Sequence, residues 1–195
     1  MPKQRITKEM VVEAAFELAR EKGMEQVLVK SIAEKLGCSV QPIYSYCQSM
    51  EGLLQDVYVR IRQFIREYLD QHIDREDFFR STGYAYIKLA EEEPNIFKMF
   101  VLHQREGIAS LDDLYRSEAG PGVADFIAQT LHIDVSAARV LHQNMLIYTV
   151  GIGTILATAL PGIPAEEIQD QLENAYQAFL EQTLKGFEGK EQVHR

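Results

Sequence analysis

The stretch from residue 28 to residue 54, LVKSIAEKLGCSVQPIYSYCQSMEGLL, constrains the fold of this chain more than any other feature. Gly37 supplies a turn position that tolerates positive φ, and Ser39 can cap a following helix with its hydroxyl. Pro42 would lie in the first turn of that helix, where its missing N–H costs little. The apolar residues fall at the spacing of two short helices that pack at a steep angle, which predicts a helix-turn-helix. They are Ile32, Ala33, Leu36, Val40, Ile43 and Tyr44.

Helical periodicity continues along the rest of the chain, and no segment alternates as a β-strand does, so the predicted fold class is all-α. Thr7 is expected to cap a helix over residues 8–22 that Gly23 ends. The pattern of residues 50–72 predicts a helix of roughly 30 Å, long enough to connect the N-terminal part to a second domain. Further helices are expected at residues 74–93 with Asp74 as the cap, 95–104 after Pro94, 122–132, 134–160 and 166–187, with residues 105–117 less regular.

Charge is distributed unevenly over the 195 residues. Residues 1–50 carry seven Lys or Arg against six Glu, whereas the rest carries thirteen basic and twenty-three acidic residues, and the net charge is −9. The acidity therefore belongs to the C-terminal part. The nearly neutral N-terminal part can still present a local basic face, because attraction to phosphate acts within about one Debye length, ~8–10 Å.

Several functional classes lack their motifs in this chain. Its two cysteines, Cys38 and Cys47, form no CxxC or Cys/His metal spacing, and both fall in the packed N-terminal part, which disfavours a redox sensor. No GxSxG motif and no glycine-rich phosphate loop occurs, so no enzyme, metal site or cofactor is expected. No N-terminal apolar run resembles a signal peptide, which favours a cytoplasmic location.

The order of these features resembles the TetR/AcrR family of transcriptional regulators, with the specific motifs in residues 6–54. The resemblance implies an all-helical homodimer with a helix-turn-helix DNA-binding domain at residues 1–49, a ligand-binding and dimerisation domain at 50–188 and a tail at 189–195. The matching positions are Val11, Val12, Ala14, Ala15, Leu18 and Gly23 in the first helix, Ile32, Ala33, Gly37, Ser39 and Tyr44 in the motif, and Glu51, Leu53 and Leu54 after it.

Three positions depart from the pattern of that family. Leu28 stands where Thr is usual, so the second helix lacks a capping oxygen, and Cys47 stands where Phe is usual, so the core is expected to be looser there. Met50 stands where the family usually has a Lys that touches a DNA phosphate. Its loss should weaken DNA binding uniformly and reduce the salt slope by about one charge per subunit.

The resemblance also places the second helix of the motif in the major groove of DNA. Gln41 can bond N6 and N7 of adenine and is the first candidate for base readout. Tyr44 and Tyr46 can reach phosphates with their hydroxyls, although Tyr44 can equally belong to the core. The candidate DNA-binding residues are Lys30, Ser39, Gln41, Tyr44, Ser45 and Tyr46, and the arm with Lys3 and Lys8 can add charge.

Residues 140–165 contain no Asp, Glu, Lys or Arg. Polar residues and glycines dilute this run, so a buried helix is favoured over a membrane span. One face would border an internal cavity, and another would join the last helix in a four-helix homodimer interface, as the resemblance also implies. The candidate ligand-binding residues combine aromatic walls with a few polar groups. They are Tyr84, Tyr86, Phe97, Phe100, His103, Asn144, Met145, Tyr148 and Thr149.

The sequence therefore favours a ligand-responsive DNA-binding transcriptional regulator. We expect a repressor that binds a palindromic double-stranded DNA operator as a homodimer and is released by a small, largely apolar effector. The alternative is a protein of the same fold that acts through a protein partner and binds DNA weakly, which Met50 and the overall acidity favour.

Overall fold

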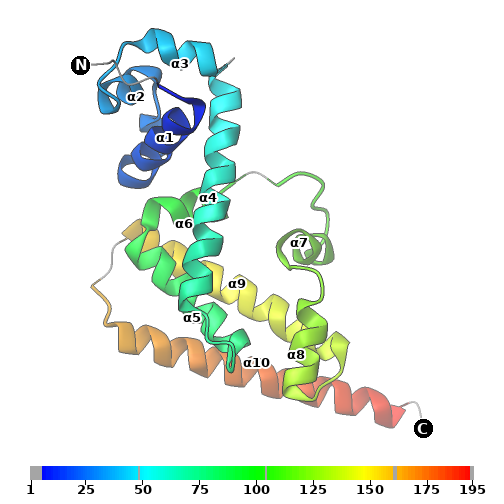
Figure 1. Cartoon of the computed structure of the whole chain (residues 1–195). Coiled ribbons are helices and arrows are strands. Elements are labelled where there is room, and N and C mark those ends of the chain that lie inside the picture. The colour runs from blue at the N-terminus through cyan, green and yellow to red at the C-terminus, as the bar shows by residue number, and fades with distance from the viewer. Residues whose placement is uncertain (1–5, 48, 104, 160–161, 194–195) are drawn as a thin grey trace.

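All regular structure is helical in the computed structural model, which describes residues 6–47, 49–103, 105–159 and 162–193. Three N-terminal helices, α1 to α3, gather beside one half of α4 and form what we call the head (Figure 1). Helices α5 and α6 pack against the other half of α4, and α7 to α10 complete the larger domain. The helices are α1 (Lys8–Lys22), α2 (Val29–Lys35), α3 (Val40–Tyr46), α4 (Met50–His72), α5 (Phe78–Glu92), α6 (Pro94–Val101), α7 (Leu111–Glu118), α8 (Val123–Leu131), α9 (Val135–Ala159) and α10 (Ala165–Val193), with a 3-10 helix at Met24–Gln26.

The ends of the head helices follow from local sequence. The side chain of Thr7 accepts a hydrogen bond from the Met10 backbone N–H at 3.3 Å, and Gly23 ends α1 with a φ of +93°, as predicted. Gly37 has a φ of +63° in the turn of the motif, also as predicted. Ser39 stands at the N-cap of α3 but makes no capping hydrogen bond, so that expectation was wrong, and its exposed hydroxyl is left to solvent.

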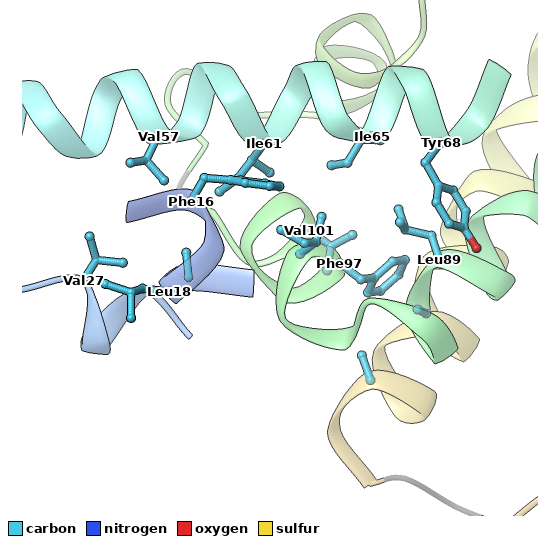
Figure 2. Close-up of a cluster of buried hydrophobic side chains, with 14 of the residues drawn as sticks. Phe16, Leu18, Val27, Val57, Ile61, Ile65, Tyr68, Leu89, Phe97 and Val101 are labelled. Carbon is cyan, nitrogen blue, oxygen red and sulfur yellow. The ribbon is translucent and has the colours of Figure 1, made fainter. Parts of the chain in front are cut away.

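Helix α4 joins the head to the larger domain through one continuous core. Ser49 caps it by accepting from the Gly52 backbone N–H at 3.0 Å, and its buried face packs on both domains. Phe16 from α1 and Phe97 from α6 lie beneath this same face (Figure 2). The core therefore runs from α1 through α4 into the larger domain without a break. The buried face of α4 consists of Leu53, Val57, Ile61, Ile65 and Tyr68.

Helix α9 is the centre of the larger domain and packs against α5, α6, α8 and α10. Gly153 lies where α9 meets α6. A β-carbon at this position would lie 2.3 Å from Cζ of Phe97, well inside van der Waals contact. The missing side chain therefore allows the buried Phe97 ring to lie directly against the α9 backbone.

The structure corrects three details of the predicted helices. Asp74 does not cap α5, because its carboxylate accepts from the Glu76 backbone N–H at 2.9 Å in the preceding turn, and the helix begins at Phe78. Residues 111–118 form α7 where an irregular segment was expected, since Ser110 caps a helix there by accepting from the Asp113 N–H at 3.1 Å. Helix α10 continues to Val193, past the expected end.

Candidate functional site

Helix α3 presents one face to the head and the other to solvent. Ile43 is fully buried, and α3 contacts α1 and α2 on that side. Gln41 and Ser45 are exposed on the other side. Val40 and Tyr44 are 42% and 63% exposed, so the expectation that they pack between the two motif helices was wrong, because this seven-residue helix buries a single narrow face.

The remaining candidate positions on the head differ in their environment. Ser39 is exposed at the start of α3, whereas Tyr46 is half-buried at its end. The Ser45 hydroxyl donates to the Pro42 carbonyl at 2.7 Å, so its oxygen remains able to accept a hydrogen bond. The exposed polar surface of α3 is therefore centred on Gln41, Tyr44 and Ser45.

The basic groups of the head are partly neutralised. Lys8 lies 2.7 Å from Asp56, and Lys35 lies 3.1 Å from Glu21, so these two cations are paired. Lys30, exposed on α2, makes no ion pair with any residue that the structure describes. Lys3 is outside the described residues.

The three departures from the family pattern have distinct surroundings. Leu28 is 53% exposed at the N-cap of α2 and provides no side-chain cap. Cys47 is buried in the head, and burial raises the pKa of its thiol. Met50 is half-buried as the first residue of α4 and directly follows Ser49, the N-cap of that helix.

The larger domain contains a partly open cavity of about 410 Å³ among α5, α6, α9, α10 and the segment around α7 and α8. Its walls are mainly apolar and include seven Phe and Tyr rings. Six of the nine ligand-binding candidates line it, which is two-thirds of the set. They are Tyr84, Tyr86, Phe97, Phe100, Met145 and Thr149.

The other three candidates lie away from the cavity wall. His103 is exposed beyond the end of α6. Asn144 is half-buried on α9 and is not among the residues that line the cavity. Tyr148 turns toward α10, where its hydroxyl accepts from the side-chain amide of Gln171 at 2.8 Å.

Several lining residues were not among the sequence candidates. His142 could have been found, because it lies three residues before Met145 and seven before Thr149, on the same face of α9. The charged lining residues could not be predicted from local sequence, because the residues they pair with are distant in the chain. The lining residues that the sequence did not predict include Phe79, Arg80, Arg105, Glu118, His142 and Glu173.

The charged groups of the wall form two ion pairs. Arg80 on α5 donates to Glu173 on α10 at 2.5 Å, and the hydroxyl of Tyr84 donates to the same carboxylate at 3.4 Å. Burial opposes ionisation of Glu173, but hydrogen bonds from Gln177 and Arg80 hold its pKa below the ordinary value overall. Arg105 donates to Glu118 at 2.5 Å.

His142 is the one titratable imidazole among the described lining residues. Its Nδ1 lies 3.0 Å from the hydroxyl oxygen of Tyr115, and its ring meets Phe79 edge-on. Burial lowers the pKa of His142 below its ordinary value, so the imidazole is neutral at pH 7.

Helix α6 connects the cavity to the head. Its residues Phe97 and Phe100 line the cavity, while its first residues contact α1. Arg20 Nε donates to Glu93 Oε2 at 2.8 Å, and the Asn95 side-chain amide donates to the Arg20 carbonyl at 2.9 Å. A displacement of α6 by a bound molecule would therefore act directly on α1.

Residues 11–57, from the first turns of α1 into α4, match the family model of bacterial regulatory proteins of the tetR family. The head of this chain therefore carries the DNA-binding domain of the tetR family. The matched segment contains the whole helix-turn-helix, with Gln41 and Tyr44 on its exposed face. The chain is accordingly a transcriptional regulator with a DNA-binding head. The predicted all-helical fold class is confirmed.

Solved structures share the fold of this chain over nearly its whole length. A TetR-family transcriptional regulator from Haemophilus influenzae has a TM-score of 0.56 at 16% identity, covering 88% of this chain and 94% of that one. A putative TetR-family regulator from Vibrio parahaemolyticus has a TM-score of 0.54 at 16% identity, covering 88% and 97%. A transcriptional regulator from Rhodococcus has a TM-score of 0.52 at 14% identity, covering 93% and 97%. No curated protein matches the sequence.

Two further observations bear on the expected classes. Helix α9 is long and apolar enough to cross a membrane by length and composition, but it packs against four other helices of the TetR-family fold. The core helix of a globular domain passes the same test. Within the described residues, no group of His, Cys, Asp and Glu could hold a metal ion.

Proposed function

We propose that this regulator is a repressor that binds a palindromic operator as a homodimer and is released when a small molecule enters the larger-domain cavity. The observation that carries the proposal is the exposed polar face of α3, within a head that matches the family. Gln41 would read an adenine, and Tyr44, Ser45 and Lys30 would contact the backbone or neighbouring bases. Ser39 and Tyr46 would flank this surface.

The dimer is supported by an apolar face of α9 that remains about half exposed within the described chain. Val140, Ile147 and Ile155 are 42%, 44% and 55% exposed, and Gly151 lies between them on the same face. The apolar stripe of α10 contributes less than its sequence indicates, because Ile168, Leu172 and Tyr176 are buried in the core of their own chain. An isologous pair would place two heads on half-sites about 34–36 Å apart.

Release is supported by the path from the cavity to the head. Helix α6 lines the cavity with Phe97 and Phe100 and holds Arg20 of α1 through Glu93 and Asn95. Moving a two-state equilibrium from 99% to 1% occupancy of the DNA-binding state requires a preference of about 5.5 kcal/mol for the other state. The effector must therefore bind the two states with very different affinities.

The direct test is fluorescence anisotropy of the purified protein with the DNA upstream of its own gene, at two salt concentrations. We expect tight, sequence-selective binding that weakens steeply with salt, because phosphate contacts release counterions. Absence of binding at low salt to this DNA and to a genomic pool would contradict the proposal. That result would favour the second candidate, a protein-partner role, for which the net charge of −9 and Met50 are the supporting observations. Equal effector affinity of operator-bound and unbound protein would exclude release.

A further inference from the structure

Each formal charge in the cavity wall is paired with an opposite charge of the protein. One polar atom of these groups, Arg80 Nε, is buried 3.8 Å from Asp77 and has no hydrogen-bond partner among the described residues. Arg105 donates from Nε to Glu118 and from Nη1 to the backbone carbonyls of Val101 and His103. Arg80 donates to Glu173, and its guanidinium lies 5.4 Å from the ring centre of Tyr176. An ionic ligand would therefore meet no unpaired counter-charge among the described lining residues, and burying an unpaired charge is strongly unfavourable.

At least four other polar groups of the wall retain hydrogen-bonding capacity. One is the hydroxyl of Tyr176, which forms no hydrogen bond within the described residues, and the other three are Tyr86, Thr149 and His142. Within the described part of the chain, the hydroxyls of Tyr86 and Thr149 form no hydrogen bond, and His142 uses its Nδ1 alone. The contrast within α9 is informative. Thr154 and Thr158 donate to the carbonyls four residues earlier, at 2.7 and 2.6 Å, whereas the buried Thr149 makes no such bond.

These three groups are set in an aromatic wall. His142 and Thr149 lie seven residues apart on one face of α9, roughly 10 Å along the helix, with Met145 between them. Tyr86 stacks on Phe100, with ring centres 6.0 Å apart. Flat rings fit such a wall, and the polar atoms can each bond an oxygen at its edge.

We propose that the cavity selects an uncharged ring compound, with its apolar body against the aromatic wall and at least one hydroxyl or carbonyl oxygen bonded by Tyr86, Thr149 or His142. This inference rests on the proposed effector site and narrows its ligand from a largely apolar molecule to a neutral, oxygen-bearing one. Carboxylates and ammonium compounds of the same shape are rejected.

The test compares three probes with one biphenyl body: para-phenylphenol, para-phenylbenzoate and para-phenylbenzylammonium. Each is titrated into the purified full-length protein, without DNA, by isothermal titration calorimetry. We expect the neutral phenol to bind at least roughly tenfold more tightly than either ion, the factor that a poorly paired buried charge readily exceeds. An ion that binds as tightly as the phenol, or a phenol that does not bind up to its solubility limit, would overturn the proposal.

Variants identify the polar contact. Tyr86→Phe, Thr149→Val and His142→Gln each change one polar group, and we expect at least one of them to lower phenol affinity by roughly fivefold to tenfold. Thr158→Val is the matched control, because its hydroxyl bonds to Thr154 on an exposed part of α9. Unchanged affinity in all three variants would overturn the assignment. Operator binding is measured in a separate experiment. A failed ligand test would therefore not contradict the proposed repressor, and a failed operator test would not contradict the proposed ligand selectivity.

Discussion

Arg20 of α1 and Glu93 at the start of α6 form a two-point ion pair across the boundary between the head and the larger domain. The Glu93 side chain is 13% exposed, so this pair is better shielded from water and salt than an ordinary surface pair. Arg20 also lies over the ring of Phe64 on α4, at 5.0 Å from its centre. One side chain therefore ties α1 to the two helices that lead to the cavity.

Arg20→Gln is expected to reduce the free energy of unfolding by about 1–2 kcal/mol, because Glu93 loses both of its hydrogen-bond donors. Urea unfolding measures this change. Lys185→Gln is the matched control, since Lys185 pairs with Glu181 on an exposed turn of α10 and should cost less than about 0.5 kcal/mol. If the two variants lose the same stability, the Arg20 pair does not tie the domains together.

Gly153→Ala is expected to destabilise the protein by about 1–3 kcal/mol, although alanine favours a helix more than glycine does. The added carbon meets the ring of Phe97, which must move into the cavity or carry α6 with it. Thermal unfolding with and without a bound probe measures the effect. Gly186→Ala, where nothing lies within 4 Å of the added carbon, should be neutral or stabilising. A Gly153→Ala protein as stable as its parent would show that Phe97 is not held in place here.

Met50→Lys is expected to strengthen operator binding and to steepen its salt dependence by about one charge per subunit, because one phosphate contact is added at the start of α4. Anisotropy titrations at several salt concentrations give the slope. Met50→Gln adds a polar group without charge and should leave the slope unchanged. An unaltered slope for the lysine variant would place this position away from the DNA backbone.

Gln41→Ala is expected to relax the preference of the protein for one or two base pairs, since a bidentate contact to a base is worth about 1–3 kcal/mol of discrimination. Binding to a set of single-base operator variants measures this preference. The same selectivity in the variant and the parent would remove Gln41 from base readout.

His142→Gln is expected to make stability less sensitive to acid. Burial lowers the pKa of His142 in the folded protein, so the unfolded chain takes up its proton first, below about pH 6.5. The stability contributed by the neutral imidazole is complete above this value and is lost as the pH falls toward the folded-state pKa. Urea midpoints at about pH 7.5 and about pH 5 measure the loss. His103→Gln, at an exposed position, is the control, and a variant at residue 142 that loses as much stability as the parent would contradict the argument.

Local sequence predicted some helix ends from a cap or breaker, although the expected caps Asp74 and Ser39 were wrong. Helix α4 spans Met50–His72, as its apolar spacing predicted, α6 begins at Pro94, and Gly23 ends α1. Helix α7 was not predicted. It has only eight residues, which is too few for a helical spacing of apolar residues to be distinguished from the irregular segment before it.

The cavity was only partly readable from sequence, since packing between distant helices decides which side of a helix faces it. Met145 and Thr149 lie on the lining face of α9, but Asn144 and Tyr148, adjacent in sequence, point elsewhere. The pairing of Arg80 with Glu173 joins residues 93 positions apart and has no local signature.

The unbroken core beneath α4 also determines how the molecule opens. Phe16 of the head and Phe97 of the cavity wall belong to one buried cluster, so the head is not a separate folding unit (Figure 2). In native-state hydrogen exchange, the amides of α1 and α9 should then open together in one cooperative event. A molecule bound in the cavity would slow amide hydrogen exchange in the head, and this protection should be measurable in the absence of DNA.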